Sequence, residues 1–286
     1  MRSMADAVER TALVTGGSRG VGRGVALALA EAGWRVVVTG RGDDGRPSEA
    51  LRAVAGEVDE RGGHGVAIAC DHRDDSAIAA LFEQVDEIGL LDLLVNNVWA
   101  GPGLESMFKP FWERPVSDWD LLVGLGLRAH YVASHQAAPR MIERGHGLII
   151  NISSFGARGR LHSVAYGVSK VGLDKMAADM AVDLADTGVT TLSLWPGLVR
   201  TETLLAAGVE EIEGFPVAEA ETPEFVGRVI RALAEDPATA RRSGHTLVAT
   251  EVAEEYGILD ERGQRPRSHR QAFGGGPLFP PPTDVD

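Results

Sequence analysis

The stretch Ala12-Leu13-Val14-Thr15-Gly16-Gly17-Ser18-Arg19-Gly20-Val21-Gly22 decides the fold. In it a short apolar run leads into clustered glycines, and residues 25–30 then form a pattern typical of a helix. Glycines in such a turn permit a tight bend and let a pyrophosphate approach the backbone and the N-terminus of the helix. A plain strand-to-helix turn can use the same residues, so the motif alone is a weak signal. Its place after the first strand of an α/β chain favours nucleotide binding by Gly16, Ser18, Arg19, Gly20, Val21 and Gly22.

Short apolar runs alternate with longer helical patterns along the rest of the chain. The apolar runs are continuous, which is typical of strands buried on both faces of a sheet. Strands interleaved with helices imply right-handed βαβ units and a parallel sheet. The sequence therefore predicts one α/β domain, a Rossmann-type doubly wound parallel sheet. We expect strands at 12–14, 36–39, 66–70, 91–95, 147–152, 190–194 and 246–249, and helices at 48–61, 76–88, 118–143, 166–186 and from Thr222 onward.

Two segments at the ends of the chain have a different composition. Residues 1–8 are expected to form a flexible N-terminus ahead of a domain at 9–267. Residues 268–286 contain Gly274-Gly275-Gly276-Pro277 and three consecutive prolines, a composition that disfavours a packed core. We expect this tail to be flexible or to lie over another surface.

The overall composition excludes several classes of protein. The 41 acidic residues outnumber the 28 basic ones and give a net charge of −13, which argues against a nucleic-acid partner. No apolar run approaches the roughly 18 residues of a membrane-spanning helix, and residues 1–10 lack the apolar segment of a signal peptide. Cys70 is the single cysteine, so a reducing, cytoplasmic setting is expected. The eight histidines show no metal-ligand spacing, and no metal is expected.

Tyr166 and Lys170 stand four residues apart, twelve residues after Ser154. On a helix this spacing places the phenol and the ammonium on one face. A free tyrosine has a pKa near ~10, and a cation within a few ångströms favours the phenolate. A serine hydroxyl can polarise a carbonyl or alcohol oxygen beside the pair. The spacing also occurs by chance on amphipathic helices, so its interpretation depends on the rest of the chain.

The end of the second strand indicates which dinucleotide is bound. An NAD site usually places an acid there for the ribose hydroxyls. Here the strand ends at Gly40-Arg41, and no acid follows until Asp43. Arg19 and Arg41 can hold a 2′-phosphate by charge-assisted hydrogen bonds, although Asp43 or Asp44 can also turn back toward the ribose. We favour NADP(H) over NAD(H).

These motifs stand in the order T-G-x-x-x-G-x-G, Ser, Y-x-x-x-K, and the chain resembles the short-chain dehydrogenase/reductase family across residues 9–252. The resemblance implies that Ser154, Tyr166 and Lys170 are catalytic, and that Tyr166 and Lys170 also contact the cofactor. It implies that Asp71 meets the adenine amine, and that a homodimer or homotetramer forms through the helices at 118–143 and 166–186. The further cofactor-binding positions are Asn96, Pro196, Gly197, Val199 and Thr201, and loops at about 99–117 and 200–222 are expected to hold the substrate.

Three departures from the family pattern bear on the site. The Ser–Tyr spacing is one residue shorter than usual, and Ser153 would restore it, but the strand pattern at 149–154 favours Ser154. The family's N-N-A-G becomes Asn96-Asn97-Val98-Trp99-Ala100-Gly101, so that a Trp and an extra pair of residues lie near the cofactor. The family's fourth catalytic residue, an Asn that holds a water for proton relay to the lysine, falls on Gly126. Similar departures, and the runs at 111–113, 126–131, 193–197 and 256–260, resemble one subgroup of the family.

Several other side chains are candidates for the substrate pocket. Trp99, Phe108, Phe111 and Trp112 form either a packed loop or subunit contact, or an apolar substrate wall. His162 lies in the loop between Ser154 and Tyr166 and can line the substrate mouth. His130 and His135 are expected to be packing or surface groups.

The sequence therefore predicts an NADP(H)-dependent oxidoreductase that interconverts a carbonyl and a secondary alcohol on a small, lipophilic substrate. The alternative is an NADP(H)-binding sensor of the same fold with little catalysis, motivated by Gly126 and Trp99. Use of the cofactor for epimerisation or dehydration ranks last, because the chain lacks the longer substrate domain of such relatives.

Overall fold

Seven parallel strands form one sheet in the order β11-β8-β7-β6-β1-β2-β5. From β1 the chain first adds β2 and β5 on one side and then crosses over to add β6, β7, β8 and β11 on the other side, so the strand order reverses between β1 and β6. The computed structural model describes residues 10–101, 106, 109–212 and 214–279. The reversal is the switch point at which doubly wound sheets bind ligands, beyond the carboxyl ends of the strands. The strands are β1 (Thr11–Thr15), β2 (Arg35–Gly40), β5 (His64–Ala69), β6 (Leu91–Asn96), β7 (Gly147–Ile152), β8 (Val189–Trp195) and β11 (Thr246–Val248).

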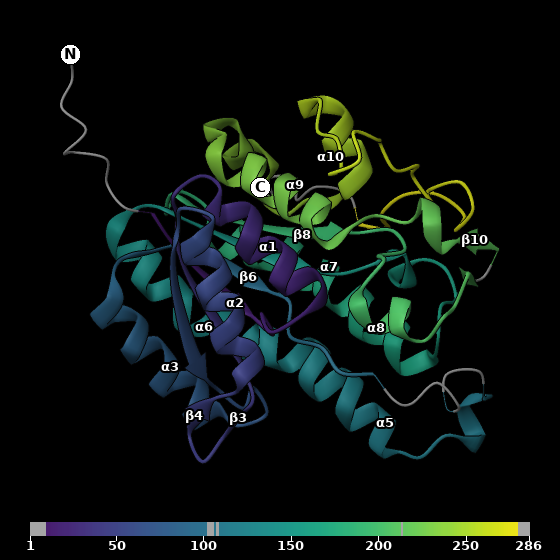
Figure 1. The fold of residues 1–286 in the computed structure, drawn as a ribbon, viewed down its shortest axis with the longest axis horizontal. Coiled ribbons are helices and arrows are strands. Elements are labelled where there is room, and N and C mark those ends of the chain that lie inside the picture. The colour runs from purple at the N-terminus through teal and green to yellow at the C-terminus, as the bar shows by residue number, and fades with distance from the viewer. Residues whose placement is uncertain (1–9, 102–105, 107–108, 213, 280–286) are drawn as a thin grey trace.

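Helices cover both faces of this sheet (Figure 1). One apolar core lies between the sheet and α1 (Gly20–Ala30), α2 (Glu49–Glu60), α9 (Pro223–Glu235) and α10 (Ala249–Tyr256). The second core lies on the opposite face, against α3 (Asp75–Ile88), α6 (Ala129–Arg144) and the end of α7 (Val164–Asp183). Burial on both faces explains why the strands are continuous apolar runs, and the predicted doubly wound α/β fold is confirmed.

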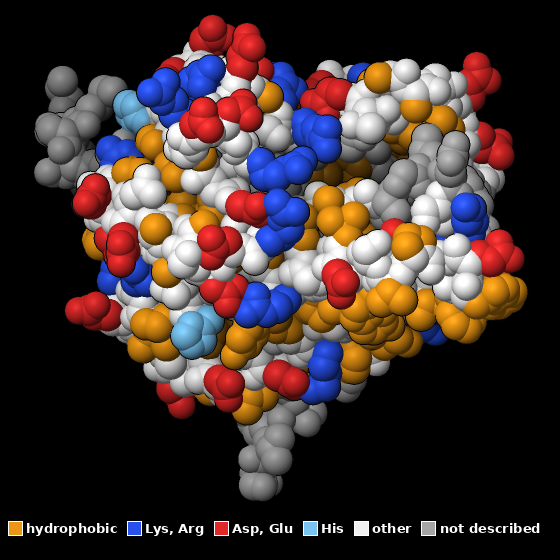
Figure 2. Space-filling model, turned by 90° about the horizontal axis from the view of Figure 1, so that it is seen from below, with side chains coloured by type: hydrophobic (Ala, Val, Ile, Leu, Met, Phe, Trp, Pro, Cys, Tyr) orange, Lys and Arg blue, Asp and Glu red, His pale blue; other side chains and the backbone are white. Residues whose placement is uncertain are grey.

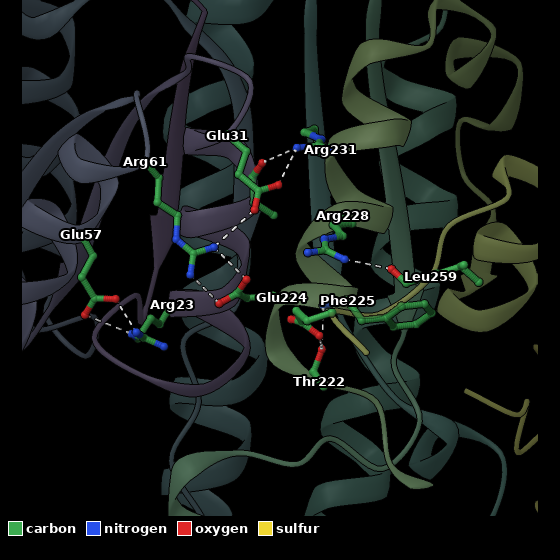
Figure 3. A network of polar contacts seen from close by, with 12 residues as sticks. Arg23, Glu31, Glu57, Arg61, Thr222, Glu224, Phe225, Arg228, Arg231 and Leu259 are labelled. Atoms are coloured by element: carbon green, nitrogen blue, oxygen red, sulfur yellow. Dashed lines mark hydrogen bonds and ion pairs between the residues drawn. The ribbon is translucent and has the colours of Figure 1, made fainter. Parts of the chain in front are cut away.

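Helices α1 and α9 approach each other closely through glycines. A Cβ on Gly24 would overlap the backbone of Pro223, and one on Gly227 would overlap the backbone of Gly24. Around this contact Arg61 bridges the helices, with Nη1 2.8 Å from Glu224 and 3.3 Å from Glu31 (Figure 3). Such exposed pairs each contribute about 0–1 kcal/mol. The close packing therefore does most to fix the start of α9 beside the glycine-rich turn.

The segment predicted as one helix over 118–143 is divided into three parts. Residues Ser117–Trp119 form α5, Asp120–Arg128 form the π-helix η2, and α6 begins at Ala129. Gly124 and Gly126 lie within η2, where the low helix propensity of glycine favours departure from regular α-helical geometry. The prediction of one regular helix is wrong at this point, and π-helical turns often accompany functional sites.

Local capping moves other boundaries away from their predicted positions. Helix α7 starts at Val164 rather than Tyr166 because the Ser163 hydroxyl accepts a hydrogen bond from the Tyr166 amide (3.1 Å), and it ends at Asp183. The short elements that the pattern does not reveal are the hairpins β3 (Gly42–Asp43) with β4 (Arg46–Pro47) and β9 (Glu211–Ile212) with β10 (Phe215–Pro216), helix α8 (Glu202–Ala206), and the 3-10 turns η1 (Phe111–Glu113), η3 (Phe155–Ala157), η4 (Val217–Glu219) and η5 (Pro237–Arg242). Within the described ranges, no helix is long and apolar enough to cross a membrane.

The C-terminal segment up to residue 279 lies against the domain. Arg158 donates hydrogen bonds to the carbonyls of Gly274 (2.6 Å) and Gly276 (3.0 Å). The Arg270 guanidinium pairs with Glu251 at 2.5 Å, and the Phe273 ring lies 5.5 Å from the Phe155 ring. The tail is expected either to be flexible or to lie over another surface. Its described part lies over the surface of the domain. The predictions for residues 1–8, Phe108 and 280–286 lie outside the described residues.

Exposed apolar side chains gather on the segment that leads into η2. Phe111, Trp112, Val116 and Trp119 are 64%, 72%, 80% and 45% exposed. Figure 2 looks onto the side of the molecule where α5 lies and shows a band of hydrophobic side chains there. The interpretation of Phe111 and Trp112 as a packed loop is wrong for the single chain, whereas a subunit contact stays a prediction.

Candidate active site

Ser154 and Tyr166 are in direct contact beyond the end of β7. The Tyr166 hydroxyl donates to Ser154 Oγ at 2.8 Å, and the same oxygen accepts from the Gly156 amide at 3.0 Å. Ser153 points elsewhere: its hydroxyl donates to the Lys170 carbonyl at 3.0 Å and is buried. The geometry therefore brings Ser154, and not Ser153, to the phenol. A loop one residue shorter than the family's is accommodated by the turn η3.

Lys170 lies beneath Tyr166 on the same face of α7. Its Nζ donates to the carbonyl of Ile152 at 2.9 Å and lies 5.7 Å from the centre of the Tyr166 ring. Burial lowers the pKa of Lys170 to about 8, although the charge of Asp174 acts in the opposite direction. The ammonium is thus held close to the phenol in surroundings with little water, where its charge acts strongly.

Two further rings surround Tyr166. Trp99 meets it edge-on with ring centres 6.2 Å apart, and His162 does so at 4.8 Å. The turn that carries His162 is held by Arg114, which donates to the His162 carbonyl at 2.9 Å. Burial lowers the pKa of His162, and the charges of Arg114 and Lys170 add to this effect. Trp99 and His162 are therefore placed to form walls around a substrate oxygen at Tyr166.

Trp99 also borders the glycine at position 126. A Cβ on Gly126 would lie 3.4 Å from Trp99 Cδ1 and 3.8 Å from Ser169 Oγ, which are ordinary van der Waals contacts. The indole thus packs directly beside a position that carries no side chain.

The glycine-rich turn is built to receive an anion. Gly16 and Gly20 have φ of 68° and 54°, which favour glycine, and the Gly17 amide donates to the Thr39 carbonyl at 2.8 Å. Asn97 supports the turn, since Nδ2 donates to the carbonyls of Thr15 (2.9 Å) and Gly16 (3.1 Å). The residue before α1, Arg19, makes no side-chain cap, so the first helical amides can meet an anion.

A carboxylate already lies at this end of α1. Glu202, the first residue of α8, accepts a hydrogen bond from the Gly20 amide at 2.9 Å and lies 3.6 Å from Arg23. Its position shows that the N-terminus of α1 accepts negative charge. Sequence reasoning missed Glu202, because the contact joins residues 182 positions apart. Ser18 and Val21 lie in the same turn and are partly buried.

The residues expected to bind the adenosine end are on the surface beside this turn. Arg19 and Arg41 are exposed, and the hydrogen bond from Gly17 to Thr39 fixes the turn against the end of β2. Arg41 acts on Asp71 through its charge. Arg73 lies closer and holds the Asp71 carboxylate at 2.5 Å, so that the pKa of Asp71 falls to about 2. The carboxylate expected to meet the adenine is therefore engaged by an arginine neighbour.

Asn96 does not fit its expected role as a cofactor ligand through its side chain. The side chain is fully buried, and Nδ2 donates to Ser134 Oγ (2.9 Å), Asn151 Oδ1 (3.0 Å) and the His130 carbonyl (3.3 Å). The Asn96 side chain therefore faces α6. The side chain of its neighbour Asn97 points to the other face, because side chains alternate between the two faces of a strand. The side chain of Asn97 faces the glycine turn instead. His130 is a buried packing group bonded to the Val98 carbonyl (2.9 Å), and His135 stacks on Tyr131.

The segment Pro196-Gly197-Leu198-Val199-Arg200-Thr201 rests on a buried acid. Glu221 is 1% exposed, and its Oε1 accepts from the Gly197 amide at 2.7 Å. Val199 pairs with Glu221 in a short parallel bridge, and Thr201 caps α8. Burial raises the pKa of Glu221 to about 8, against the effect of the Gly197 amide. Its Oε2 has no partner among the described residues.

Aromatic residues from the C-terminal segment complete this side of the site. The His269 ring lies 4.5 Å from Phe215 and 6.2 Å from Phe155, and a Cβ on Gly197 would overlap it. The cluster joins the residue after Ser154 to the substrate loop at 200–222. Sequence reasoning missed His269 because the tail's composition indicated flexibility.

Comparison with known proteins defines the class to which this site belongs. A family model described as short chain dehydrogenase matches residues 10–210. The chain belongs to the short-chain dehydrogenase/reductase family, whose members bind NAD(P) and act on CH–OH or carbonyl groups of small molecules. The family resemblance predicted from the motifs is confirmed.

Individual relatives show which members of the family the chain is similar to. The chain is 43% identical over 265 residues to dehydrogenase/reductase SDR family member 1 of Homo sapiens, covering 88% of this chain and 83% of the relative. It is 32% identical over 241 residues to 3-oxoacyl-[acyl-carrier-protein] reductase of Synechocystis sp., covering 83% and 94%. The crystal structure of a metagenomic short-chain oxidoreductase in complex with NADP matches with a TM-score of 0.67 at 32% identity, covering 84% and 96%. The subgroup indicated by the four sequence runs is that of the human relative, as predicted.

Proposed function

We propose that the protein is an NADP(H)-dependent oxidoreductase that interconverts a carbonyl and a secondary alcohol on a small, lipophilic substrate. The observation that carries the proposal is the contact of Tyr166 with Ser154 at 2.8 Å above the buried ammonium of Lys170. A bound nicotinamide would supply or accept the hydride. The chain's own groups then need to hold the substrate oxygen and move one proton.

Each catalytic side chain has a distinct task in this proposal. Ser154 donates a hydrogen bond to the substrate oxygen and keeps it beside the phenol. Tyr166 gives its proton to that oxygen when a carbonyl is reduced, and takes it back when an alcohol is oxidised. Lys170 favours the phenolate through its charge and would also meet the nicotinamide ribose. Trp99 and His162 flank the phenol and exclude water from it.

Two features support NADP(H) as the preferred cofactor. Arg19 and Arg41 are exposed on elements that the bond from Gly17 to Thr39 holds together. Guanidinium groups suit a 2′-phosphate, since they offer planar, charge-assisted hydrogen bonds. The proposal for the pyrophosphate is that it lies on the uncapped start of α1, at Gly16, Ser18, Gly20, Val21 and Gly22, with the nicotinamide amide toward Pro196, Gly197, Val199 and Thr201.

The apolar walls support a lipophilic substrate. Trp99 is 42% exposed at the phenol, and Phe215 and Phe273 line the neighbouring side. Apolar lining with a few convergent polar groups is typical of small-molecule pockets. We further propose a homodimer or homotetramer through α6 and α7, as the family resemblance implies, and a cytoplasmic location.

Replacing Tyr166 by Phe tests the chemistry. The variant keeps the ring that packs against Trp99 and His162 but loses the hydroxyl, so turnover should fall at least about a hundredfold while NADPH still binds. Tyr131→Phe, at an exposed position on α6, is the matched control. The assay follows NADPH absorbance with a panel of ketones and alcohols. If Tyr166→Phe retains wild-type turnover the mechanism is wrong, and cofactor binding by the wild type without any turnover would favour the sensor instead.

A further inference from the structure

Asp174 is a buried acid one turn beyond Lys170 on α7. It is 1% exposed and faces β8. Ser193 donates to Asp174 Oδ1 at 2.5 Å, and the indole Nε1 of Trp195 donates to its two oxygens at 3.1 and 2.9 Å. A buried carboxylate surrounded by donors in this way is held ionised in one orientation. Burial raises the pKa of Asp174 to about 6, although the donors and the charge of Lys170 act in the opposite direction.

Among the described residues, Lys170 has no ion-pair partner within reach of a hydrogen bond. Within the part of the chain that the structure describes, its Nζ bonds only to the Ile152 carbonyl, and no salt bridge includes it. Asp174 lies one helical turn away on the same buried side, and its charge acts on Lys170. Ser153 lies between the two positions: its hydroxyl donates to the Lys170 carbonyl at 3.0 Å, and its proximity lowers the pKa of Asp174.

Of the acids that the structure describes, only Asp174 acts on Lys170. His130 faces it from α6 and His162 from the turn before α7, while Tyr166 lies on α7 itself. Burial lowers the pKa of His130 to about 3 and that of His162 as well, so both imidazoles are neutral near pH 7. The buried ammonium therefore depends on one carboxylate for its compensating charge.

We propose that Asp174 is a positioning residue of the active site, whose buried carboxylate keeps the Lys170 ammonium charged so that Tyr166 can act as a base near neutral pH. This role rests on the proposed function and extends the catalytic machinery by one residue. It acts through Lys170 and requires no contact with substrate. A low-dielectric path between the two groups makes their interaction strong at a separation of one helical turn.

A purely structural role makes a different prediction. In that case Asp174 would only fasten α7 to β8 through Ser193 and Trp195. Its replacement would lower stability and scale activity down equally at every pH. The pH dependence of the reaction separates the two roles, because only the electrostatic one changes the pH at which the base works.

The test is Asp174→Asn, which keeps the shape and an acceptor oxygen but removes the charge. With NADP⁺ and an alcohol, the midpoint of the rise of kcat/KM with pH should move up by about one unit, so that the rate at pH 7 falls about tenfold and is recovered near pH 10. The Kd for NADPH should not change. Asp179→Asn, on the exposed side of the same helix, is the matched control and should leave the profile in place.

Should Asp174→Asn fail to fold, Ser193→Ala and Trp195→Phe give an independent test. Each removes a donor from the carboxylate and makes its protonation easier, so each should move the midpoint in the same direction by less. A folded Asp174→Asn protein with an unchanged midpoint, or with an equal loss at all pH values, overturns the inference while leaving the proposed function intact. A wild-type protein with no turnover overturns both.

Discussion

The buried carboxyl of Glu221 predicts an unusual dependence of stability on pH. The group sits behind Gly197, and desolvation raises its pKa from 4.5 to about 8. Between these two values the folded protein keeps the proton while the unfolded chain has released it. Folding therefore takes up a proton, and the free energy of unfolding falls as pH rises through this window. The expected loss is absent below pH 4.5 and complete above pH 8.

The size of the effect follows from the shift. Each pKa unit corresponds to about 1.4 kcal/mol, so Glu221 alone removes about 4 kcal/mol between pH 5 and pH 8. For a domain of this length that equals about 8 °C in Tm. Relaxation around a buried charge reduces this figure, so it is an upper bound.

Glu221→Gln isolates this contribution from every other titrating group. The amide oxygen can still accept from the Gly197 amide, and the side chain keeps its shape while it loses the titrating group. Thermal unfolding of both proteins at pH 5 and pH 8 should show a smaller fall in Tm for the variant, by several degrees. Glu219→Gln, an exposed neighbour, should behave as wild type. Equal falls for Glu221→Gln and wild type would refute the reasoning.

Two predictions concern the dinucleotide. The double variant Arg19→Ala/Arg41→Ala should raise KM for NADPH at least tenfold and leave KM for NADH unchanged, because a hydrogen bond to a charged group contributes about 1.5–3 kcal/mol; equal effects on both cofactors in steady-state kinetics would count against a 2′-phosphate site. Glu202→Gln removes a negative charge from the start of α1, where the Gly20 amide donates a hydrogen bond to the Glu202 carboxylate. Fluorescence titration should show dinucleotide binding about two- to fivefold tighter, since an anion at a helix N-terminus is worth about 0.3–1 kcal/mol, and weaker binding would show that Glu202 does not compete with the pyrophosphate.

The fold could be predicted from the sequence because local and global signals agree. The central strands are apolar runs buried between two layers of helices, as β7 illustrates with all six residues buried, whereas the edge strands β5 and β11 are more exposed. The π-helical segment at 120–128 could not be found this way. Its sequence keeps an apolar pattern compatible with an α-helix, and two glycines alone do not distinguish a π-helix from an α-helix.

The candidate site divides in the same manner. Spacing alone predicts that Ser154, Tyr166 and Lys170 come together. The serine lies at the end of a predicted strand, and the tyrosine and lysine lie on one face of a predicted helix. Spacing does not reveal Glu221 or Glu202, because each acts through a contact with a residue far along the chain. Asp174 stands at helical spacing from Lys170, but the sequence gives no sign that it is buried against Ser193 and Trp195. The orientation of the Asn96 side chain could not be predicted for a related reason, because the sequence does not say which of two adjacent asparagines faces the glycine-rich turn.

Two departures from the family pattern lie next to each other in the fold. Trp99 borders position 126, where a Cβ would lie 3.4 Å from its Cδ1. The same indole packs edge-on against Tyr166, and His162 packs on the phenol at 4.8 Å. Aromatic rings therefore flank the phenol on two sides. The contact between Tyr166 and Ser154 is kept in these surroundings, which argues for an enzyme with an apolar pocket over a binding protein that has lost its chemistry.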